Sequence, residues 1–371
     1  MAGPGVVRAQ AGEADGAAVE RAGEVLRAGG VIAVPTDTVY GLVADPHNEE
    51  AAARIYGIKD RDPHKPLAAL AAGADAAWAL CEAVPDEARR LALAFWPGAL
   101  TLVLRAGDLC PASLTAADGF VGVRVPRCPF VCELARRGCG VLASTSANPS
   151  GGPDPLRAED VIRLLGGGVD LVVDGGATPG ASASTVVRLG GGAPEVLREG
   201  AVSSRAILWA LADGPQRVRS LLFVCTANIC RSAYAERKMR AVLGAMGVGG
   251  IGVSSAGVMA GRGSPMYRVM AEELSARGGD PEGHRSQPLS AKLVARADLI
   301  LCMEGEHLEI VCRAFPKAAE RAFLIGSFVG LGCDIADPVM QPGVSSISLA
   351  ADRIDLAVEI LAERLRAWRR E

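Results

Sequence analysis

Short apolar runs recur along the chain, and turn-forming or polar residues end each one. Residues 31–34, 221–224 and 297–302 have the length and composition of buried strands. Near the end of the chain, residues 346–366 carry apolar side chains at helical spacing, which predicts a long helix with one buried face. Predicted strands that alternate with predicted helices favour an α/β architecture.

Polar residues mark the start of several predicted helices. Asp15 precedes a helical stretch that ends near Gly29, and Asn48 precedes one that runs to about Ile58. A further short helix is predicted over residues 203–211. The side-chain oxygens of Asp and Asn accept hydrogen bonds from the first free N–H groups of a helix, so these residues fix where the helices begin.

The chain is long enough for more than one domain. Its 371 residues suggest two or three domains, and half of them are apolar, so sizeable cores can form. The Asp-Gly-Pro-Gln sequence at residues 213–216 has the composition of a connecting turn. We therefore predict a first domain over residues 1–205, a linker over residues 206–217 and a second domain over residues 218–371.

Composition argues against several classes of protein. No run of roughly 18 or more apolar residues occurs, so neither a transmembrane helix nor a membrane partner is expected. Residues 1–12 lack the basic start and apolar core of a signal peptide. The ten cysteines show no Cys-x-x-Cys pair and no metal spacing, which indicates a reducing cytoplasm. The formal net charge of −3 argues against a basic nucleic-acid clamp.

One polar loop joins a predicted strand to a predicted helix and carries reactive chemistry. It reads Cys-Thr-Ala-Asn-Ile-Cys-Arg-Ser over residues 225–232. Backbone N–H groups and a helix N-terminus in such a loop form a phosphate cradle, and the same positive field lowers the pKa of the Cys225 thiol. Arg231 can hold two phosphate oxygens with its planar guanidinium, and the Ser232 hydroxyl can stabilise the thiolate as it leaves.

This loop closely resembles that of the low-molecular-weight protein-tyrosine phosphatase family, as do Ser-Ala-Gly at residues 255–257 and His-Arg-Ser at residues 284–286. The resemblance implies a flavodoxin-like parallel sheet and hydrolysis through a cysteinyl-phosphate, without a cofactor. It also implies that Asp337, followed by Pro338, is the general acid. Asp334 is the rival for that role, but no proline follows it.

Four positions leave the phosphatase substrate open between phosphotyrosine, phosphoarginine and other phosphomonoesters. Ala227 replaces a glycine usual in the family, which predicts strain if that position needs a positive φ. Val339 and Met340 stand where tyrosine phosphatases often carry aromatic residues, and Ile229 stands where phosphoarginine-selective relatives tend to have threonine. Cys230 is either a packed small residue or the partner of Cys225 in a reversible disulfide.

The first predicted domain has its own concentration of polar and cationic residues. A mixed group of hydroxyls and one carboxylate, Pro-Thr-Asp-Thr-Val-Tyr-Gly-Leu over residues 35–42, follows a predicted strand. Lys59, Arg61 and Lys65 then lie in a proline-rich loop. In a chain that has only five lysines, two of them in one loop suggest a polyphosphate clamp; the alternative is a solvated basic loop.

Several motifs in this domain, in the same order, resemble the threonylcarbamoyl-AMP synthase family, whose fold is a YrdC-like α/β twisted sheet. They lie at residues 35–42, 55–61, 65–67, 96–101, 123–126, 144–151, 184–187 and 198–200. The family joins L-threonine, bicarbonate and ATP to give threonylcarbamoyl-AMP and pyrophosphate for tRNA modification. The resemblance therefore implies ATP with Mg2+ as a substrate, no protein ligand for a metal, and downstream tRNA threonylcarbamoyl transferase proteins as partners.

The same resemblance assigns residues to the two substrates. It implies ATP contacts for Lys59, Arg61, Lys65, Ser146, Asn148 and Arg198. It implies threonine contacts for Thr38, Arg124, Ser144 and Ser184, with the Arg124 guanidinium on the threonine carboxylate. Leu70 stands where some longer relatives carry a histidine near the threonine. Asp37 is either a turn cap or part of the site, and Arg124 could instead form a surface ion pair.

Other functions fit parts of the pattern. The first domain could bind a nucleotide or double-stranded RNA without making an adenylate, which would leave the phosphatase as the single enzyme of the chain, acting on a phosphorylated protein or a small phosphomonoester. A carbamoyl-AMP-forming relative is disfavoured, because such chains carry zinc-finger-like and acylphosphatase parts that this sequence lacks. Formation of the adenylate product distinguishes these alternatives.

Overall fold

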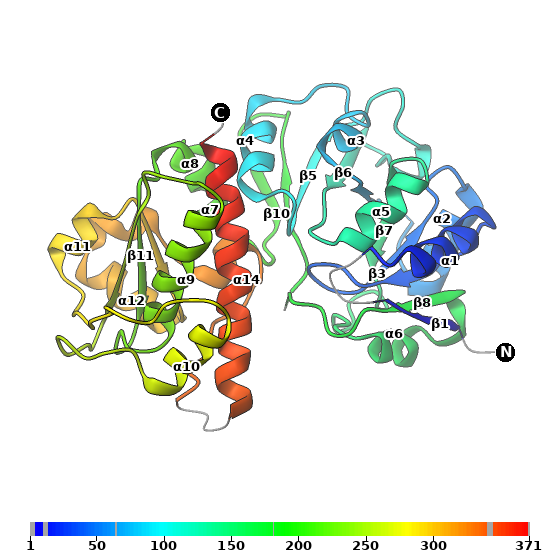
Figure 1. Ribbon diagram of the computed structural model, residues 1–371. Helices are drawn as coiled ribbons and strands as arrows, with labels where there is room; N and C mark the ends of the chain where they lie inside the picture. The colour runs from blue at the N-terminus through cyan, green and yellow to red at the C-terminus, as the bar shows by residue number, and fades with distance from the viewer. Residues whose placement is uncertain (1–3, 10–13, 64, 181, 340–343, 370–371) are drawn as a thin grey trace. The chain divides into compact units, whose positions relative to one another are not determined.

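The structure is a computed structural model that describes residues 4–9, 14–63, 65–180, 182–339 and 344–369. It contains two compact units, one formed by Met1–Val202 and Gly330–Gly332 and the other by Ser203–Val329 and Cys333–Glu371. The ribbon in Figure 1 shows both units. Each unit is an α/β domain, which confirms the predicted fold class.

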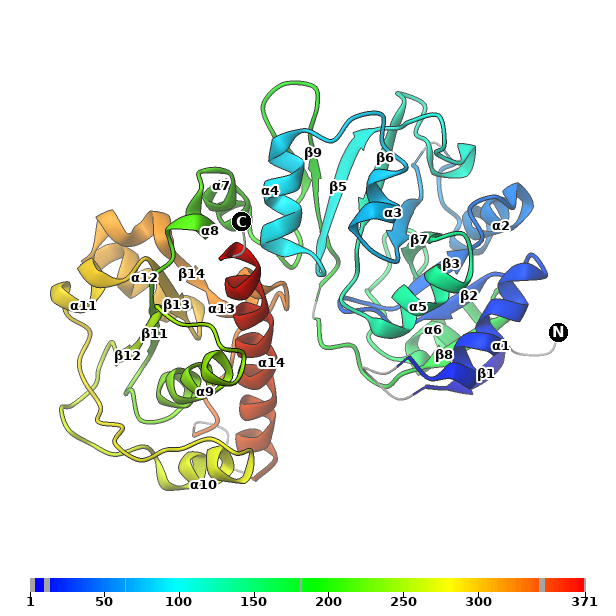
Figure 2. The ribbon, with the colours of Figure 1, turned by 45° about the horizontal axis from the view of Figure 1, so that its top comes forward.

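The described part of the first unit contains a ten-stranded mixed sheet in the order β1-β8-β2-β3-β7-β4-β6-β5-β9-β10 (Figures 1 and 2). Its strands are β1 (Gly5–Arg8), β2 (Ile32–Val34), β3 (Gly41–Ala44), β4 (Ala68–Ala71), β5 (Leu100–Arg105), β6 (Phe120–Arg124), β7 (Val141–Ser146), β8 (Leu171–Asp174), β9 (Thr185–Arg188) and β10 (Glu195–Arg198). Its helices are α1 (Gly16–Arg27), α2 (Glu49–Lys59), α3 (Ala74–Trp78), α4 (Asp86–Phe95), η1 (Ala112–Leu114), α5 (Pro129–Arg137), α6 (Ala158–Leu165) and η2 (Gly166–Gly168).

The centre of this sheet brings together segments that are far apart in the sequence. Strands β2 and β3 form an antiparallel pair, so residues 35–40 form the turn that joins the end of β2 to the start of β3. Ser144 on β7 pairs with Val43 on one side and Ala68 on the other. Leu70 on β4 pairs with Arg124 on β6. This register brings the polar residues of β6 and β7 close to the turn that follows β2.

Apolar faces of α1 and α5 cover one side of the sheet. Val19, Leu26 and Leu134 pack with Val34 and Val173 in a single buried cluster. Asp15 caps α1 by accepting hydrogen bonds from the N–H groups of the first turn, and Asn48 caps α2 in the same way. Both predicted caps are therefore confirmed, and they fix the helices that precede the site residues.

In its described residues the second unit has a four-stranded parallel sheet in the order β12-β11-β13-β14. The strands are β11 (Ser220–Cys225), β12 (Gly252–Gly257), β13 (Leu299–Cys302) and β14 (Ala322–Leu324). The helices are α7 (Ser204–Leu211), α8 (Gly214–Arg217), α9 (Arg231–Ala245), α10 (Arg268–Ala276), α11 (Ala291–Arg296), α12 (Gly305–Ala314), η3 (Pro316–Arg321), α13 (Ile325–Val329) and α14 (Val344–Trp368).

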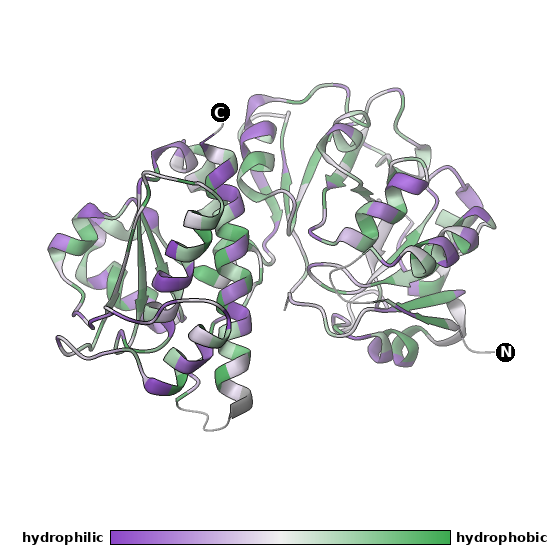
Figure 3. Ribbon diagram, viewed as in Figure 1, coloured by the Kyte–Doolittle hydropathy of each residue, from purple (hydrophilic) through white to green (hydrophobic). Residues whose placement is uncertain are grey.

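Helices cover both faces of this sheet. Helices α9 and α14 lie side by side, and α10 packs against both of them (Figures 1 and 2). A second cluster buries Val294 of α11 and Val311 of α12 against Leu222 and Ile300 of the strands. Strand β11 is hydrophobic along its length, whereas the helices carry hydrophilic bands on their outer faces (Figure 3). A parallel sheet covered on both sides needs such apolar strands.

The expected linker, residues 206–217, carries helices α7 and α8 in the structure. The ring of Trp209 packs against aromatic rings of the second unit, with centroid distances of 5.8 Å to Phe323, 5.3 Å to Phe328 and 5.8 Å to Trp368. Apolar burial of an indole favours a docked helix over a free connection.

None of the helices that the structure describes has the length and apolar character needed to cross a membrane.

Candidate active sites

A cavity of about 870 Å3 lies in the first unit, at the region where its central strands bring the polar motifs together. Such a volume suits a nucleotide-sized ligand. Eight of the ten residues predicted for ATP or threonine line this cavity: Thr38, Arg61, Lys65, Arg124, Ser144, Ser146, Ser184 and Arg198. Leu70 also lines it, at the position where a histidine was considered.

Arg124 and Asp37 form a buried ion pair at one corner of the cavity. The Arg124 guanidinium donates from Nη2 to Asp37 Oδ1 (2.7 Å), from Nη1 to Thr38 Oγ1 (3.1 Å) and from Nε to Gly98 O (2.9 Å). Arg124 is 6% exposed and Asp37 is 8% exposed, so the pair is not a surface contact. A guanidinium has five N–H groups, and these contacts leave two for a ligand. Asp37 is thus the counter-ion that orients Arg124.

The side chain of Arg198, on β10, is hydrogen-bonded to Ser184. Its Nη2 donates to Ser184 O (2.7 Å) and Ser184 Oγ (3.3 Å), and Ser184 Oγ also bonds Thr101 Oγ1 (2.9 Å). Burial lowers the pKa of Arg198 from its ordinary value, although a guanidinium remains charged at neutral pH. The structure therefore joins a residue predicted for ATP and one predicted for threonine in a single hydrogen-bonded group.

Lys59 and Asn148 lie beside the cavity and do not line it. The Lys59 ammonium, 2% exposed, donates to Ser146 O (2.5 Å), to Asn148 O and to Asn148 Oδ1 (3.2 Å). Ser146 Oγ donates to Asn148 Oδ1 (2.6 Å), which completes the turn. Burial, with a smaller effect of the Arg61 charge, lowers the pKa of Lys59 to about 8, so the ammonium is still charged at neutral pH. Lys59 thus holds the turn that carries Ser146.

Arg61 and Lys65 form the cationic side of the cavity. Arg61 donates from Nη2 to Pro66 O (3.1 Å) and from Nε to Lys65 O (3.3 Å), which fixes the loop that carries both side chains. In the described part of the chain Lys65 makes no ion pair, so its ammonium is available to an anion. Two cations on a loop beside the cavity suit the oxygens of a triphosphate.

Two arginines that were not predicted from the sequence lie over the ring of Phe120 at the cavity. Arg188 lies 3.7 Å from the centroid of the Phe120 ring, and Arg105 lies 4.8 Å from it. Arg188 Nη2 also pairs with Asp118 Oδ2 at 2.9 Å. Phe120, Arg188 and Asp118 line the cavity, whereas Arg105 does not. A guanidinium held flat on an aromatic ring offers its other face for stacking.

In the second unit, Cys225 ends β11 and the following loop wraps over the start of α9. Cys225 Sγ lies 2.9 Å from Ser232 Oγ, as the predicted roles of both residues require. Asn228 holds the loop, because its Nδ2 donates to Ser232 Oγ (2.9 Å) and Ser255 Oγ (2.8 Å). The loop also approaches β12 closely: a Cβ on Gly257 would lie 2.5 Å from Thr226 O.

The strain considered at Ala227 is not found. Among the described residues the positive φ in this loop belongs to Asn228, at 54°. Asparagine tolerates that conformation better than most residues, and here its side-chain amide is fully engaged. The glycine usual at the position of Ala227 is therefore not needed to shape this loop.

Arg231 is the most buried charge of the second site and joins two carboxylates. It is 1% exposed; Nη1 contacts Glu304 Oε2 and Nη2 contacts Asp337 Oδ2 (2.6 Å). Nη1 also donates to Ile335 O (2.9 Å). Asp337 therefore lies beside the cysteine loop, where a general acid is needed. Asp334 instead accepts a hydrogen bond from the backbone N–H of Gly305 (3.2 Å), and among the described residues it makes no hydrogen bond or ion pair with Arg231.

His307 supports the same loop and was not predicted from the sequence. Its Nδ1 accepts from the backbone N–H of Glu304 (3.2 Å), so Nε2 carries the proton and donates to Thr226 Oγ1 (2.9 Å). Burial, followed by the nearby Arg231 charge, lowers the pKa of His307 from its ordinary value. The neutral imidazole is therefore the form that fits both contacts.

Acid is expected to destabilise the second unit through His307. Because the folded protein lowers the pKa of His307, the unfolded chain binds more protons below about pH 6.5, and stability falls as the pH decreases through that range. Calorimetry of the full chain between pH 7 and pH 5 should show a melting temperature lower by roughly 2–4 °C, and His307→Gln should reduce this loss. The matched control, His47→Gln at an exposed site, should keep it. An identical pH dependence in both variants would show that His307 does not cause the loss of stability in acid.

Cys230 sits at the N-terminus of α9 and is buried, and burial raises the pKa of its thiol to about 12. The cysteines are free thiols in the structure.

The two positions where an aromatic wall was possible are Val339 and Met340. Met340 lies outside the described residues, while Val339 is exposed and donates its N–H to Asp337 Oδ1 (3.0 Å).

Within the described ranges, no three His, Cys, Asp or Glu side chains are grouped as metal ligands.

Comparisons with known proteins match two separate parts of the chain to two different families. The family model for Sua5, YciO and YrdC proteins, described as “Telomere recombination”, matches residues 24–200. The model described as “Low molecular weight phosphotyrosine protein phosphatase” matches residues 220–370.

Individual proteins agree with these matches. A threonylcarbamoyl-AMP synthase of Stenotrophomonas maltophilia is 41% identical over 162 residues, which cover 42% of this chain and 86% of that protein. The solved structure of P. abyssi Sua5 complexed with L-threonine is 24% identical, covers 86% of this chain and 98% of its own, and has a TM-score of 0.53. A solved low molecular weight protein tyrosine phosphatase of T. tengcongensis is 34% identical and covers 39% of this chain and 97% of its own, with a TM-score of 0.37.

Proposed function

We propose that this chain, which belongs to the threonylcarbamoyl-AMP synthase family and carries a low-molecular-weight phosphatase domain after the synthase domain, performs two reactions. The first makes threonylcarbamoyl-AMP and pyrophosphate from L-threonine, bicarbonate and ATP. The second hydrolyses a phosphomonoester or phosphoramidate through Cys225. The observation that carries the first reaction is that eight of the ten residues expected for ATP and for threonine line one cavity.

In the synthase domain, threonine would lie at the buried corner of the cavity. The two N–H groups that Arg124 does not use internally take the threonine carboxylate, and Asp37 keeps the guanidinium in place. Thr38, Ser144 and Ser184 offer hydroxyls around it. The threonine amine and CO2 form a carbamate, whose oxygen attacks the α-phosphorus of ATP while the bond to pyrophosphate breaks.

The cations of the cavity serve the departing pyrophosphate. Arg61 and Lys65 stand on one loop and Arg198 on β10, so positive charge surrounds the phosphates without any covalent help. Such preorganised charge is the main requirement of phosphoryl transfer. Ser146 lines the same cavity beside the phosphates, on the turn that Lys59 and Asn148 hold in place.

Incorporation of labelled bicarbonate tests this reaction. With 13C-bicarbonate, ATP, Mg2+ and L-threonine, the product adenylate should carry one 13C atom in mass spectra. An adenylate without the label, or no adenylate from folded protein, would contradict the proposal and favour a binding module.

The adenine ring of ATP is expected to stack on Arg188, which lies over the Phe120 ring and lines the cavity. Loss of one stacking partner costs roughly 1–3 kcal/mol, so Arg188→Ala should raise KM for ATP about tenfold with a smaller effect on kcat. The measurement is pyrophosphate release at varied ATP. Arg105→Ala is the matched control, because Arg105 stacks on the same ring outside the cavity. Equal effects of both variants would rule out a role of Arg188 in ATP binding.

In the phosphatase domain, the Cys225 thiolate would attack phosphorus while Arg231 and the loop N–H groups hold the phosphate oxygens. Asp337, 2.6 Å from Arg231, protonates the leaving atom as its bond to phosphorus breaks. The same carboxylate then takes a proton from the water that attacks the cysteinyl-phosphate, and Ser232 stabilises the released thiolate.

Asp337→Ala is expected to slow hydrolysis by about two to four orders of magnitude. The loss should be larger for phenyl phosphate than for p-nitrophenyl phosphate, because the poorer leaving group depends more on protonation. Asp334→Ala is the control and should lose little, since the carboxylate of Asp334, within the described residues, accepts from the backbone N–H of Gly305 and does not pair with Arg231. A larger loss in the Asp334 variant would reverse the assignment of the acid.

The proposed partners follow from the product of the synthase domain and from the substrate of the phosphatase domain. Threonylcarbamoyl-AMP is an activated acyl donor, so proteins that transfer its acyl group to tRNA would act next. The phosphatase would act on a phosphorylated protein or a small phosphomonoester.

A further inference from the structure

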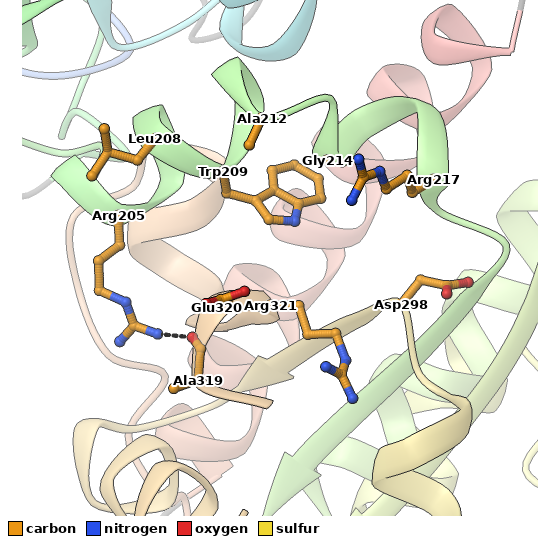
Figure 4. A pocket seen from close by; sticks show the side chains of 10 residues that line it. All are labelled: Arg205, Leu208, Trp209, Ala212, Gly214, Arg217, Asp298, Ala319, Glu320 and Arg321. Atoms are coloured by element: carbon orange, nitrogen blue, oxygen red, sulfur yellow. Dashed lines mark hydrogen bonds between the residues drawn. The ribbon is translucent and has the colours of Figure 1, made fainter. Parts of the chain in front are cut away.

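A second cavity, of about 560 Å3, lies in the phosphatase unit and is separate from the Cys225 loop. Helices α7 and α8 form one wall, and η3 with the residue before β13 forms the other (Figure 4). Asp298 at its edge precedes β13, whereas Cys225 follows β11, and the two strands are parallel. The cavity is therefore at the edge where the strands begin, and the catalytic loop is at the edge where they end.

Trp209 provides a rigid aromatic surface in this cavity. Three aromatic rings of the unit hold its indole, and the backbone of Gly214 packs against it so closely that a Cβ there would lie 2.2 Å from the ring. Leu208, which is 62% exposed, also lines this wall. A fixed aromatic ring with neighbouring apolar groups suits the flat body of a small ligand.

The cavity also contains positive charge without a counter-ion. Among the described residues, Arg205 and Arg321 donate hydrogen bonds to backbone carbonyl oxygens, at 2.9 Å to Ala322 O and 2.8 Å to Ala297 O, and not to carboxylates. Arg217 makes no hydrogen bond or ion pair with any described residue, and its guanidinium points toward Trp209 in Figure 4. No carboxylate of the described chain is ion-paired with any of the three guanidinium groups that line the cavity. An anionic group is what such guanidinium groups bind best.

Two carboxylates complete the lining. Asp298 uses one oxygen for the backbone N–H of Arg219 (2.8 Å) and the hydroxyl of Ser220 (2.7 Å), which leaves its other oxygen as an acceptor. Glu320 forms no ion pair in the described part of the chain. Carboxylates that face a site accept hydrogen bonds from hydroxyl groups, and they disfavour ligands with several negative charges spread along their length.

We propose that this cavity binds a nucleoside monophosphate. The base lies on Trp209, the phosphate pairs with Arg217 in the field of Arg205 and Arg321, and the ribose hydroxyls donate to Glu320 or Asp298. AMP has a chemical source nearby, because any reaction that transfers the acyl group of an acyl-adenylate releases AMP. The site itself is inferred from the cavity and stands without that reaction.

The test follows the indole N–H signals of the full 15N-labelled chain by NMR, with AMP as the probe. The chain has four tryptophans, and Trp209→Phe assigns the signal of interest. Cys225→Ser is used throughout so that the phosphate is not removed at the catalytic loop. AMP should shift the Trp209 signal saturably, and Arg217→Gln should weaken this binding by at least about tenfold. Arg366→Gln, at an exposed site away from the cavity, should bind as the parent chain does.

Three further ligands separate the parts of the interaction. Adenosine lacks the phosphate, ribose 5-phosphate lacks the base, and indole-3-acetate is an aromatic anion without a ribose, so each should bind more weakly than AMP. An unmoved Trp209 signal at millimolar AMP, an equal response in Arg217→Gln, or a preference for indole-3-acetate would each overturn the proposal. Arg61→Ala should retain the Trp209 response, which separates this site from ATP binding in the synthase cavity.

Discussion

Cys225→Ser is expected to lower phosphatase activity by at least about four orders of magnitude, because an alcohol cannot replace the thiolate as the nucleophile at neutral pH. The Cys225 sulfur is buried, 2.9 Å from Ser232 Oγ, at the turn from β11 into α9. Arg231 begins α9, six residues after Cys225, and contacts Asp337 and Glu304. The measurement is hydrolysis of p-nitrophenyl phosphate by the full chain.

A second cysteine substitution separates loss of the nucleophile from loss of the fold. Cys312, a half-buried thiol on α12, tests the same chemical change away from the loop. Cys312→Ser should keep close to full activity. Residual turnover in Cys225→Ser comparable with that of Cys312→Ser would end the covalent mechanism.

Arg61→Ala is expected to reduce the rate of threonylcarbamoyl-AMP synthesis by about two to three orders of magnitude, the usual effect of removing one preorganised group from a charged transition state. Arg61 lines the cavity, and its hydrogen bonds to Lys65 O and Pro66 O also hold the loop that carries Lys65. Both cations near the phosphates are therefore affected. The readout is adenylate formation measured by mass spectrometry at saturating threonine.

The matched control is Arg21→Ala, since Arg21 is an exposed cation on α1 that pairs with Glu24 at 2.9 Å. This variant should retain the parent rate. If Arg61→Ala and Lys65→Ala both turned over at the parent rate, the clamp would be wrongly placed, even if the domain still made the product.

The sequence predicts the cysteine site well because most of that site is local. Cys225, Arg231 and Ser232 lie within eight consecutive residues, and a strand followed by a helix fixes their geometry. Asp337 is distant in sequence, yet the proline after it makes it recognisable. Glu304 carries no such mark, and it reaches Arg231 only because β13 pairs with β11 in the parallel sheet.

The sequence predicts most of the residues that line the first cavity, but it does not predict which of them form ion pairs and hydrogen bonds with one another. Asp37 and Arg124 are 87 residues apart, and their ion pair depends on the register of four strands. The sequence suggested Lys59 as a nucleotide contact, whereas its ammonium is used on the turn of Ser146 and Asn148. The sequence can single out Lys59 as a rare lysine beside other cations. It does not show which oxygen atoms accept hydrogen bonds from its ammonium.

The central claim is that one chain makes an adenylate from threonine and also carries a cysteine phosphatase. Pyrophosphate release from ATP, Mg2+ and bicarbonate, measured with and without L-threonine, tests this claim most directly. The account predicts release that requires threonine and is lost in Arg61→Ala but not in Cys225→Ser. Threonine-independent release, or none from folded protein that still hydrolyses p-nitrophenyl phosphate, would contradict it.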